Sequence, residues 1–167
     1  MKNVFKLMLL FFLVLPFQAC DNADDEFTFP EHNFNAPMLD VTPNNIAGIW
    51  ELHSWSGSDS QVPLVYVEFI RKDRKFKIYQ KFDSMYTRVI TGTYTLEEDY
   101  YKGTIIKGKY DNGSGKWNCD YIVDALYQDG LVLSVDGEEP EIHTYVRVEQ
   151  LPAEIVDNIL SADETGK

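Results

Sequence analysis

The chain has 167 residues, with 15 lysine and arginine residues against 27 aspartate and glutamate residues, and a formal net charge of −12 at pH 7. This length gives room for one domain with one sizeable core. A hydrophobic share of 44% is too high for a disordered protein, and an aromatic share of 14% favours β structure. The acidic balance argues against binding to nucleic acid. Two cysteines exclude a disulfide-dense scaffold and a zinc ribbon.

The N-terminal residues have the pattern of a secretory signal peptide. Lys2 and Lys6 precede an apolar run at residues 7–15. That run is about half of the ~20 apolar residues that a membrane-spanning helix needs. We therefore expect residues 1–19 to direct export and to lie outside the folded domain.

The residues around Cys20 resemble the lipobox of bacterial lipoproteins, since the small residue Ala19 stands directly before the cysteine. In that family the cysteine becomes the first residue of the mature chain and carries acyl chains. The resemblance thus implies lipid attachment at Cys20 and a protein held at the outer membrane or cell surface. Phe17 and Gln18 depart from the motif, which usually has leucine and a small residue there. Cleavage after Ala19 without lipid, and a disulfide between Cys20 and Cys119, stay open as alternatives.

An acidic segment that contains several prolines follows Cys20. Residues 21–26 read Asp-Asn-Ala-Asp-Asp-Glu, and Pro30, Pro37 and Pro43 come after them. The acidic patch resembles the surface-export tether of lipoproteins from Bacteroidetes-type bacteria, and its charge is also typical of a solvated linker. Both interpretations predict an unfolded segment. We assign residues 20–45 to a tether, residues 46–160 to the folded domain and residues 161–167 to a tail.

From residue 47 onward the sequence has the alternating pattern of an all-β protein. Short runs of alternating apolar and polar residues are separated by turn residues, such as the Asp-Gly pairs at 129–130 and 136–137. A short helix is predicted at residues 152–160, with Pro152 in its first position. The pattern predicts strands at residues 47–56, 64–71, 74–82, 85–97, 102–110, 117–127, 131–136 and 142–149.

These strands predict an eight-stranded antiparallel up-and-down barrel. No segment between them has a helical period long enough for a crossover helix, so consecutive strands must pair antiparallel. Closing the sheet on itself removes the exposed edges of a flat sheet. A two-sheet sandwich is the alternative that strand alternation leaves open.

The first predicted strand carries a motif that resembles a lipocalin signature. Gly48-Ile49-Trp50 is similar to the Gly-x-Trp motif of that family, and Arg147 stands on the last predicted strand where lipocalins have an arginine. The resemblance covers about residues 47–160. It implies that Gly48, Trp50 and Arg147 close one end of the barrel, with the guanidinium stacked on the indole. The short loops and short helix are more similar to the lipocalin-like domains of bacterial lipoproteins than to larger lipocalins.

The barrel interior is the candidate functional site, because a small barrel is either filled by side chains or holds one small ligand. An open lumen predicts a carrier of a small hydrophobic molecule. A filled lumen predicts an interaction module that contacts a protein partner or a glycan through its loops, or inhibits a secreted enzyme. Besides Trp50, the candidate lining residues are Phe69, Phe76, Ile78, Arg88, Tyr94, Trp117 and Tyr121.

Arg88 makes the most specific prediction of this set. It shares one strand face with Tyr94, which would place a guanidinium in the lumen. There it would pair with a barrel carboxylate or with an anionic ligand head group such as a fatty-acid carboxylate. The alternative is a β-bulge that turns Arg88 to solvent.

Motifs for catalysis, metal binding or cofactor binding are absent from the sequence. His32, His53 and His143 are far apart, and only barrel closure would bring the last two onto neighbouring strands. Cys119 has no activating motif around it. We expect no enzymatic activity, no metal and no cofactor.

Overall fold

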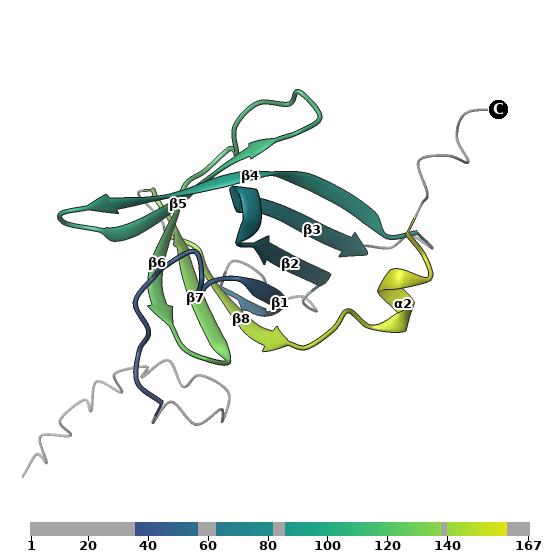
Figure 1. Ribbon diagram of the computed structural model, residues 1–167, viewed down its shortest axis with the longest axis horizontal. Coiled ribbons are helices and arrows are strands. Elements are labelled where there is room, and N and C mark those ends of the chain that lie inside the picture. Colours follow the sequence, from purple (N-terminus) through teal and green to yellow (C-terminus); the bar gives the residue numbers. More distant parts are fainter. Residues whose placement is uncertain (1–35, 57–62, 82–85, 138–139, 160–167) are drawn as a thin grey trace, which may run out of the picture. The chain divides into compact units, whose positions relative to one another are not determined.

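The computed structural model describes residues 36–56, 63–81, 86–137 and 140–159. These residues form a closed barrel of eight antiparallel strands in sequence order, with the last strand paired to the first (Figure 1). The predicted barrel is confirmed, and the sandwich is excluded. The predicted signal peptide, Cys20, His32 and the tail lie outside the described residues. The strands are β1 (Gly48–Trp55), β2 (Leu64–Ile70), β3 (Lys75–Lys81), β4 (Arg88–Asp99), β5 (Gly103–Tyr110), β6 (Tyr121–Leu126), β7 (Gly130–Val135) and β8 (Ile142–Val148).

Side-chain alternation explains which face of each strand turns inward. On β3, Phe76 is fully buried in the barrel core, whereas Lys77 on the opposite face pairs with Glu68 of β2 at 3.5 Å. The ladder between β3 and β4 keeps a regular register throughout. Successive side chains of a strand point to opposite faces, which is why Phe76 turns to the core and Lys77 to the outside.

The closed end of the barrel is built around Trp50. Its indole is fully buried, and its Nε1 donates a hydrogen bond of 2.9 Å to the carbonyl of Ile46. Arg147 is the partner of Trp50 across the β1–β8 ladder, and its Cζ lies 4.0 Å from the centre of the Trp50 ring. The predicted cation–π contact between these two residues is confirmed.

Gly48 leaves the space that the Arg147 guanidinium occupies. A Cβ atom at position 48 would collide with Nη1 of Arg147, and Gly48 has a φ of +137°, a conformation that favours glycine. The guanidinium donates hydrogen bonds to the carbonyls of Gln128, Ala47 and Asn45 at 2.5, 2.6 and 2.8 Å. The three predicted closure residues therefore act together.

The folded domain begins earlier than the predicted boundary at residue 46. Leu39 donates a backbone hydrogen bond of 2.7 Å to Leu126, and the side chains of Leu39 and Val41 pack against the barrel core. Ile46 is fully buried beside them. The prediction that residues 20–45 form an unfolded tether is thus wrong for residues 39–45. This part of the segment lacks a strand or helix period, and it is ordered by contacts with distant residues.

The C-terminal helix α2 (Ala153–Val156) is shorter than predicted, and Pro152 occupies its N-cap position. Ile155 is fully buried against Tyr66 and Tyr79 on the outer face of β2 and β3. Beyond the helix, the carbonyl of Asn158 accepts a hydrogen bond of 2.7 Å from Thr87. The C-terminal segment therefore packs against the outside of the barrel. Within the described residues, no helix has the length and apolar character needed to cross a membrane.

Candidate functional site

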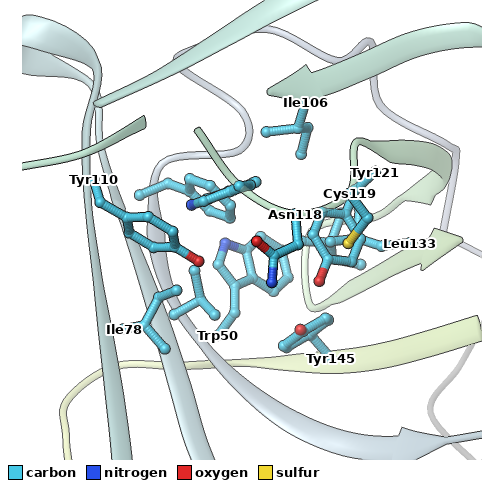
Figure 2. A pocket seen from close by; sticks show the side chains of 13 residues that line it. Trp50, Ile78, Ile106, Tyr110, Asn118, Cys119, Tyr121, Leu133 and Tyr145 are labelled. Atoms are coloured by element: carbon cyan, nitrogen blue, oxygen red, sulfur yellow. The ribbon is translucent and has the colours of Figure 1, made fainter. Parts of the chain in front are cut away.

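A cavity of about 200 Å³ lies inside the barrel, with Trp50 of the closed end in its wall (Figure 2). Most strands contribute to the wall, and the segment between β5 and β6 completes it. Six of the lining side chains are aromatic and most of the others are aliphatic. The lining residues are Trp50, Val67, Phe69, Ile78, Ile106, Tyr110, Trp117, Asn118, Cys119, Tyr121, Leu131, Leu133 and Tyr145.

Apart from Arg88, the predicted lining residues divide into two groups. Trp50, Phe69, Ile78, Trp117 and Tyr121 lie on the cavity wall, as predicted. Two others, Phe76 and Tyr94, are buried in the core but do not line the cavity. Their rings instead pack behind the wall, 4.9 Å from Trp117 and 5.1 Å from Phe69 between ring centres, respectively.

The prediction for Arg88 is wrong, because its side chain is exposed and does not line the cavity. Arg88 is the first residue of β4 and pairs with Gln80 near the end of β3. No bulge intervenes, since the register with β3 is regular from Arg88 onward. Alternation places Arg88 on the same face of β4 as Tyr94. Because Arg88 lies at the end of the strand, its guanidinium is nevertheless in solvent. A fatty-acid head group therefore has no partner there.

Several lining residues escaped the sequence analysis. Tyr145 could have been found, because it lies two residues before Arg147 on the same face of β8. Leu131 and Leu133 alternate in the same way on β7. Asn118 and Cys119 lie outside any strand, so no periodicity could have marked them.

The cavity wall between β5 and β6 is built from a non-strand segment. Only Ile105 and Ile106 of β5 pair with β6. Further along β5, the segment returns alongside the strand, and Trp117 donates a backbone hydrogen bond of 2.9 Å to Gly108. The Trp117 ring lies directly over Gly108, where a Cβ atom would overlap the indole. Residues 117–120 of the predicted strand at 117–127 are therefore not strand. They belong to a wall segment, residues 116–120, whose Trp117 side chain packs over Gly108 of β5.

Comparison with known proteins gives a partial match to a solved structure. No protein-family model and no curated protein sequence matches the chain. Among solved structures, a lipocalin-like protein from Bacteroides uniformis ATCC 8492 is 19% identical over 62% of this chain and 99% of that chain, with a TM-score of 0.47. The strand order and the Trp50–Arg147 closure of this chain define its own architecture. It is a closed eight-stranded antiparallel barrel.

The cavity of this barrel carries uncharged polar groups. The side chains of Tyr110, Asn118, Tyr121 and Tyr145 surround the same space (Figure 2). Burial raises the pKa of Tyr121 and of Tyr145 far above the usual value for tyrosine, and the neighbouring Cys119 thiol adds to the effect at Tyr121. Both phenols are therefore protonated at any physiological pH, and the phenol of Tyr121 is hydrogen-bonded to Cys119.

Charged groups of the barrel stay off the cavity wall. None of the lining residues among the described part of the chain is Asp, Glu, Lys, Arg or His. His143 lies behind the wall, with its ring centre 5.6 Å from that of Tyr121. Its Nε2 is 3.7 Å from Glu141, beyond hydrogen-bond length, so burial dominates and lowers the pKa of His143. The imidazole is thus neutral at neutral pH.

A metal site is not formed by the two histidines of β1 and β8. His143 pairs with Trp55 across the ladder, while His53 is exposed at the irregularity between Leu52 and Ser54. In the ranges that the structure describes, no three His, Cys, Asp or Glu side chains gather as metal ligands would. Cys119 has a free thiol there, and a disulfide with Cys20 lies outside those ranges.

Proposed function

We propose that the protein is a binding protein that holds one small molecule inside the barrel. The observation that supports this is the cavity of about 200 Å³ with its aromatic and aliphatic wall. An apolar cavity of about 150 Å³ is known to hold benzene, and sites for drug-sized ligands start at about 300 Å³. The ligand is accordingly compact, with no room for a long acyl chain. We assign binding without catalysis, since the described wall carries neither a charged acid–base pair nor a metal cluster.

The binding proposal can be tested by replacing a lining residue with a larger side chain that fills the cavity. Ile78→Trp adds an indole to the wall on β3, whereas Thr91→Trp adds the same group to an exposed position on the outer face of β4. Native mass spectrometry of the chain purified under mild conditions, and titration with small aromatic probes, measure occupancy. We expect Ile78→Trp to lose binding while its circular dichroism stays native, and Thr91→Trp to keep it. Equal binding by both variants would refute a site in the cavity.

We further propose that the protein is exported and anchored to the outer membrane or cell surface by acyl chains on Cys20. The support is the order of basic residues, apolar run, small residue and cysteine in residues 1–20. Two or more acyl chains give durable anchoring, whereas one gives reversible binding. Mass spectrometry of the native N-terminus tests this. A mature chain that begins elsewhere, without lipid mass, would reject the anchor and leave the binding proposal intact.

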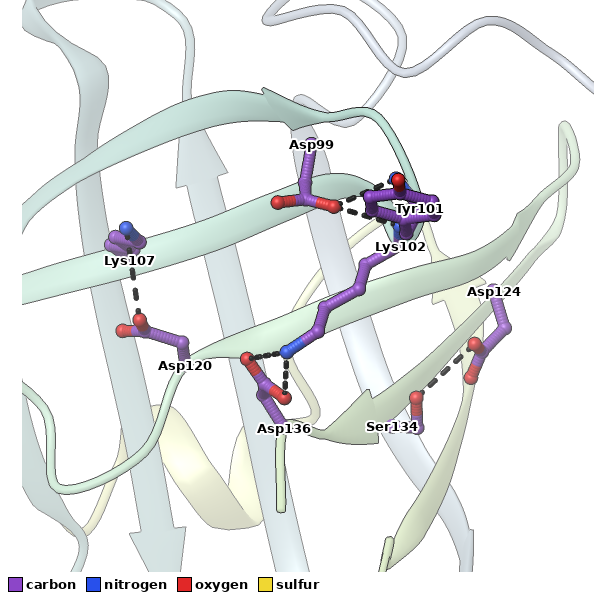
Figure 3. A network of polar contacts seen from close by, with 8 residues as sticks. All are labelled: Asp99, Tyr101, Lys102, Lys107, Asp120, Asp124, Ser134 and Asp136. Atoms are coloured by element: carbon purple, nitrogen blue, oxygen red, sulfur yellow. Dashed lines mark hydrogen bonds and ion pairs between the residues drawn. The ribbon is translucent and has the colours of Figure 1, made fainter.

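The tip of the β4–β5 hairpin supports a second candidate function, an interaction surface for a glycan. Tyr100 and Tyr101 are 93% and 91% exposed, and their rings stack edge to face at 5.0 Å. The turn that presents them is well ordered: Asp99 accepts backbone hydrogen bonds from Tyr101 and Lys102, and Lys102 pairs with Asp136 at 2.6 Å (Figure 3). Exposed aromatic side chains on a rigid support are typical of binding surfaces.

The hairpin candidate is tested separately from the cavity. In affinity electrophoresis through immobilised polysaccharides, the double variant Tyr100→Ser/Tyr101→Ser should lose any retardation that the unmodified chain shows. Ile78→Trp should keep that retardation, because it alters only the cavity. Equal migration of the unmodified chain and the double variant would exclude glycan binding by the tip.

A further inference from the structure

We infer that the ligand of the barrel cavity is an uncharged ring compound that carries a hydrogen-bond acceptor. This inference rests on the proposed binding function and adds the chemical class of the ligand. Three properties of the cavity support it: the absence of charge on its described wall, the uncharged hydrogen-bond donors that border it, and the aromatic character of its sides.

The absence of a cation excludes a carboxylate or phosphate ligand. Neither Arg147 nor Arg88 places its guanidinium at the cavity. Arg147 uses its guanidinium on three backbone carbonyls and the far side of Trp50, and Arg88 points to solvent. His143 stays neutral behind Tyr121. An anion inside the cavity would lose its hydration without gaining a counter-charge, which is a large cost.

The cavity wall offers several uncharged hydrogen-bond donors. The phenols of Tyr110 and Tyr145 and the amide of Asn118 border the cavity, and the phenol of Tyr145 is protonated. The phenol of Tyr121 also borders the cavity, but it is hydrogen-bonded to Cys119. Phenols and amides can donate to a carbonyl or ether oxygen, whereas a pure hydrocarbon would leave them without a partner. A ligand that carries such an oxygen would therefore satisfy these groups better than a pure hydrocarbon.

The sides of the cavity favour a flat ring. Trp117 and Tyr121 meet edge to face at 5.6 Å between ring centres, with an interplanar angle of 84°. Trp50 and Phe69 supply further aromatic surface. Aromatic groups prefer such offset and edge-to-face contacts with one another. A ligand with about one or two rings therefore fits both the shape and the volume of the cavity.

Two matched pairs of probes separate charge from hydrogen bonding. Benzamide and benzoate have nearly the same shape, but only benzoate is charged at pH 7. Acetophenone and isopropylbenzene also share a shape, and only acetophenone carries an acceptor. By isothermal titration of the full chain, we expect benzamide to bind at least about 100-fold more tightly than benzoate. We expect acetophenone to bind about threefold to tenfold more tightly than isopropylbenzene.

A single lysine should reverse the charge preference. Asn118 is exposed as a residue while its side chain borders the cavity, so Asn118→Lys adds a cation at the cavity without burying it. Benzoate affinity should rise about tenfold or more in this variant, with little change for benzamide. Asn112→Lys, in the exposed loop that precedes the wall segment, is the matched control and should leave both affinities unchanged.

Each outcome has a distinct meaning. Benzoate binding as tightly as benzamide to the unmodified chain would overturn the inference and leave the proposed cavity function standing. Equal affinity for acetophenone and isopropylbenzene would overturn the acceptor requirement. Failure of all four probes to bind would overturn the proposed function itself, and the ligand class with it.

Discussion

Arg147 has two roles that a lysine in its place could not perform together. Its planar guanidinium lies over the Trp50 ring and at the same time donates to carbonyls of three separate residues. A lysine ammonium has the charge but not the fork of donors. The pairing of Trp50 with Arg147 could be predicted from sequence because both lie on strands with clear alternation. The three carbonyls that fix the guanidinium could not, since they belong to turns and to the segment before β1.

Removal of the Trp50 side chain should be severely destabilising. Trp50→Ala leaves a cavity at the closed end, unpairs the carbonyl of Ile46 and removes the partner of Arg147. We expect the free energy of unfolding to fall by ~3–5 kcal/mol. Urea unfolding followed by circular dichroism measures it. Trp55→Ala, at the half-exposed end of the same strand, is the comparison. A similar, small loss in both variants would contradict the closure role.

His143 should make the barrel sensitive to mild acid. Burial lowers its pKa, so the unfolded chain binds the proton more readily than the folded one. Stability from this residue is therefore fully present above pH ~6.5, the value of an unperturbed histidine, and is lost as the pH falls below it. His143→Gln should flatten the dependence of unfolding free energy on pH between about 7 and 5. His53→Gln, at an exposed position on β1, is the control, and an unchanged slope in His143→Gln would refute the assignment.

At the scale of elements, regular strands were predictable and the wall segment at residues 116–120 was not. Period-two alternation and turn residues located all eight strands to within a few residues. Trp117 looked like a strand residue because it is aromatic and precedes β6. Its true position depends on a glycine of another strand, Gly108, and this is a tertiary contact that no local pattern encodes.

Gly108 should control how firmly the wall segment closes. Gly108→Ala would drive a methyl group into the Trp117 ring, whereas Gly137→Ala meets no atom within 4 Å. We expect the first variant to lose ~1–3 kcal/mol of stability and the second less than about 0.5 kcal/mol. In a Cys20→Ser background, Cys119 should react faster with a thiol reagent in Gly108→Ala, because the displaced segment exposes it. Equal labelling rates in the two glycine variants would contradict this.

At the scale of the whole molecule, the barrel includes a stretch of chain that the sequence assigned to a tether. Prolines and a lack of periodicity in residues 36–45 give no sign of order. The contacts that order them are made with Leu126 and Trp50, far along the chain or inside the core. Local signals cannot reveal such docking, because the energy comes from burial against the finished barrel.

Truncations should locate this boundary. A chain that starts at Ala36 should be as stable as the full chain, whereas one that starts at Ala47 should lose about 3 kcal/mol or more. The second deletion removes buried Ile46, the apolar contacts of Leu39 and Val41, and the acceptor of the Trp50 indole. Urea unfolding of both chains measures the difference. Equal stability of the two truncated chains would mean that the folded domain begins near residue 46, as the sequence predicts.

The pairing of β1 with β8 also fixes when the protein can fold. Arg147, on the last strand, is hydrogen-bonded to Ala47, which directly precedes the first strand, across a separation of 100 positions in the sequence. Until Ile142–Val148 is available, β1 lacks one of its two neighbours and the floor around Trp50 cannot form. Contacts so distant in sequence form late. A chain that is still being synthesised therefore cannot close its barrel until the last strand has emerged.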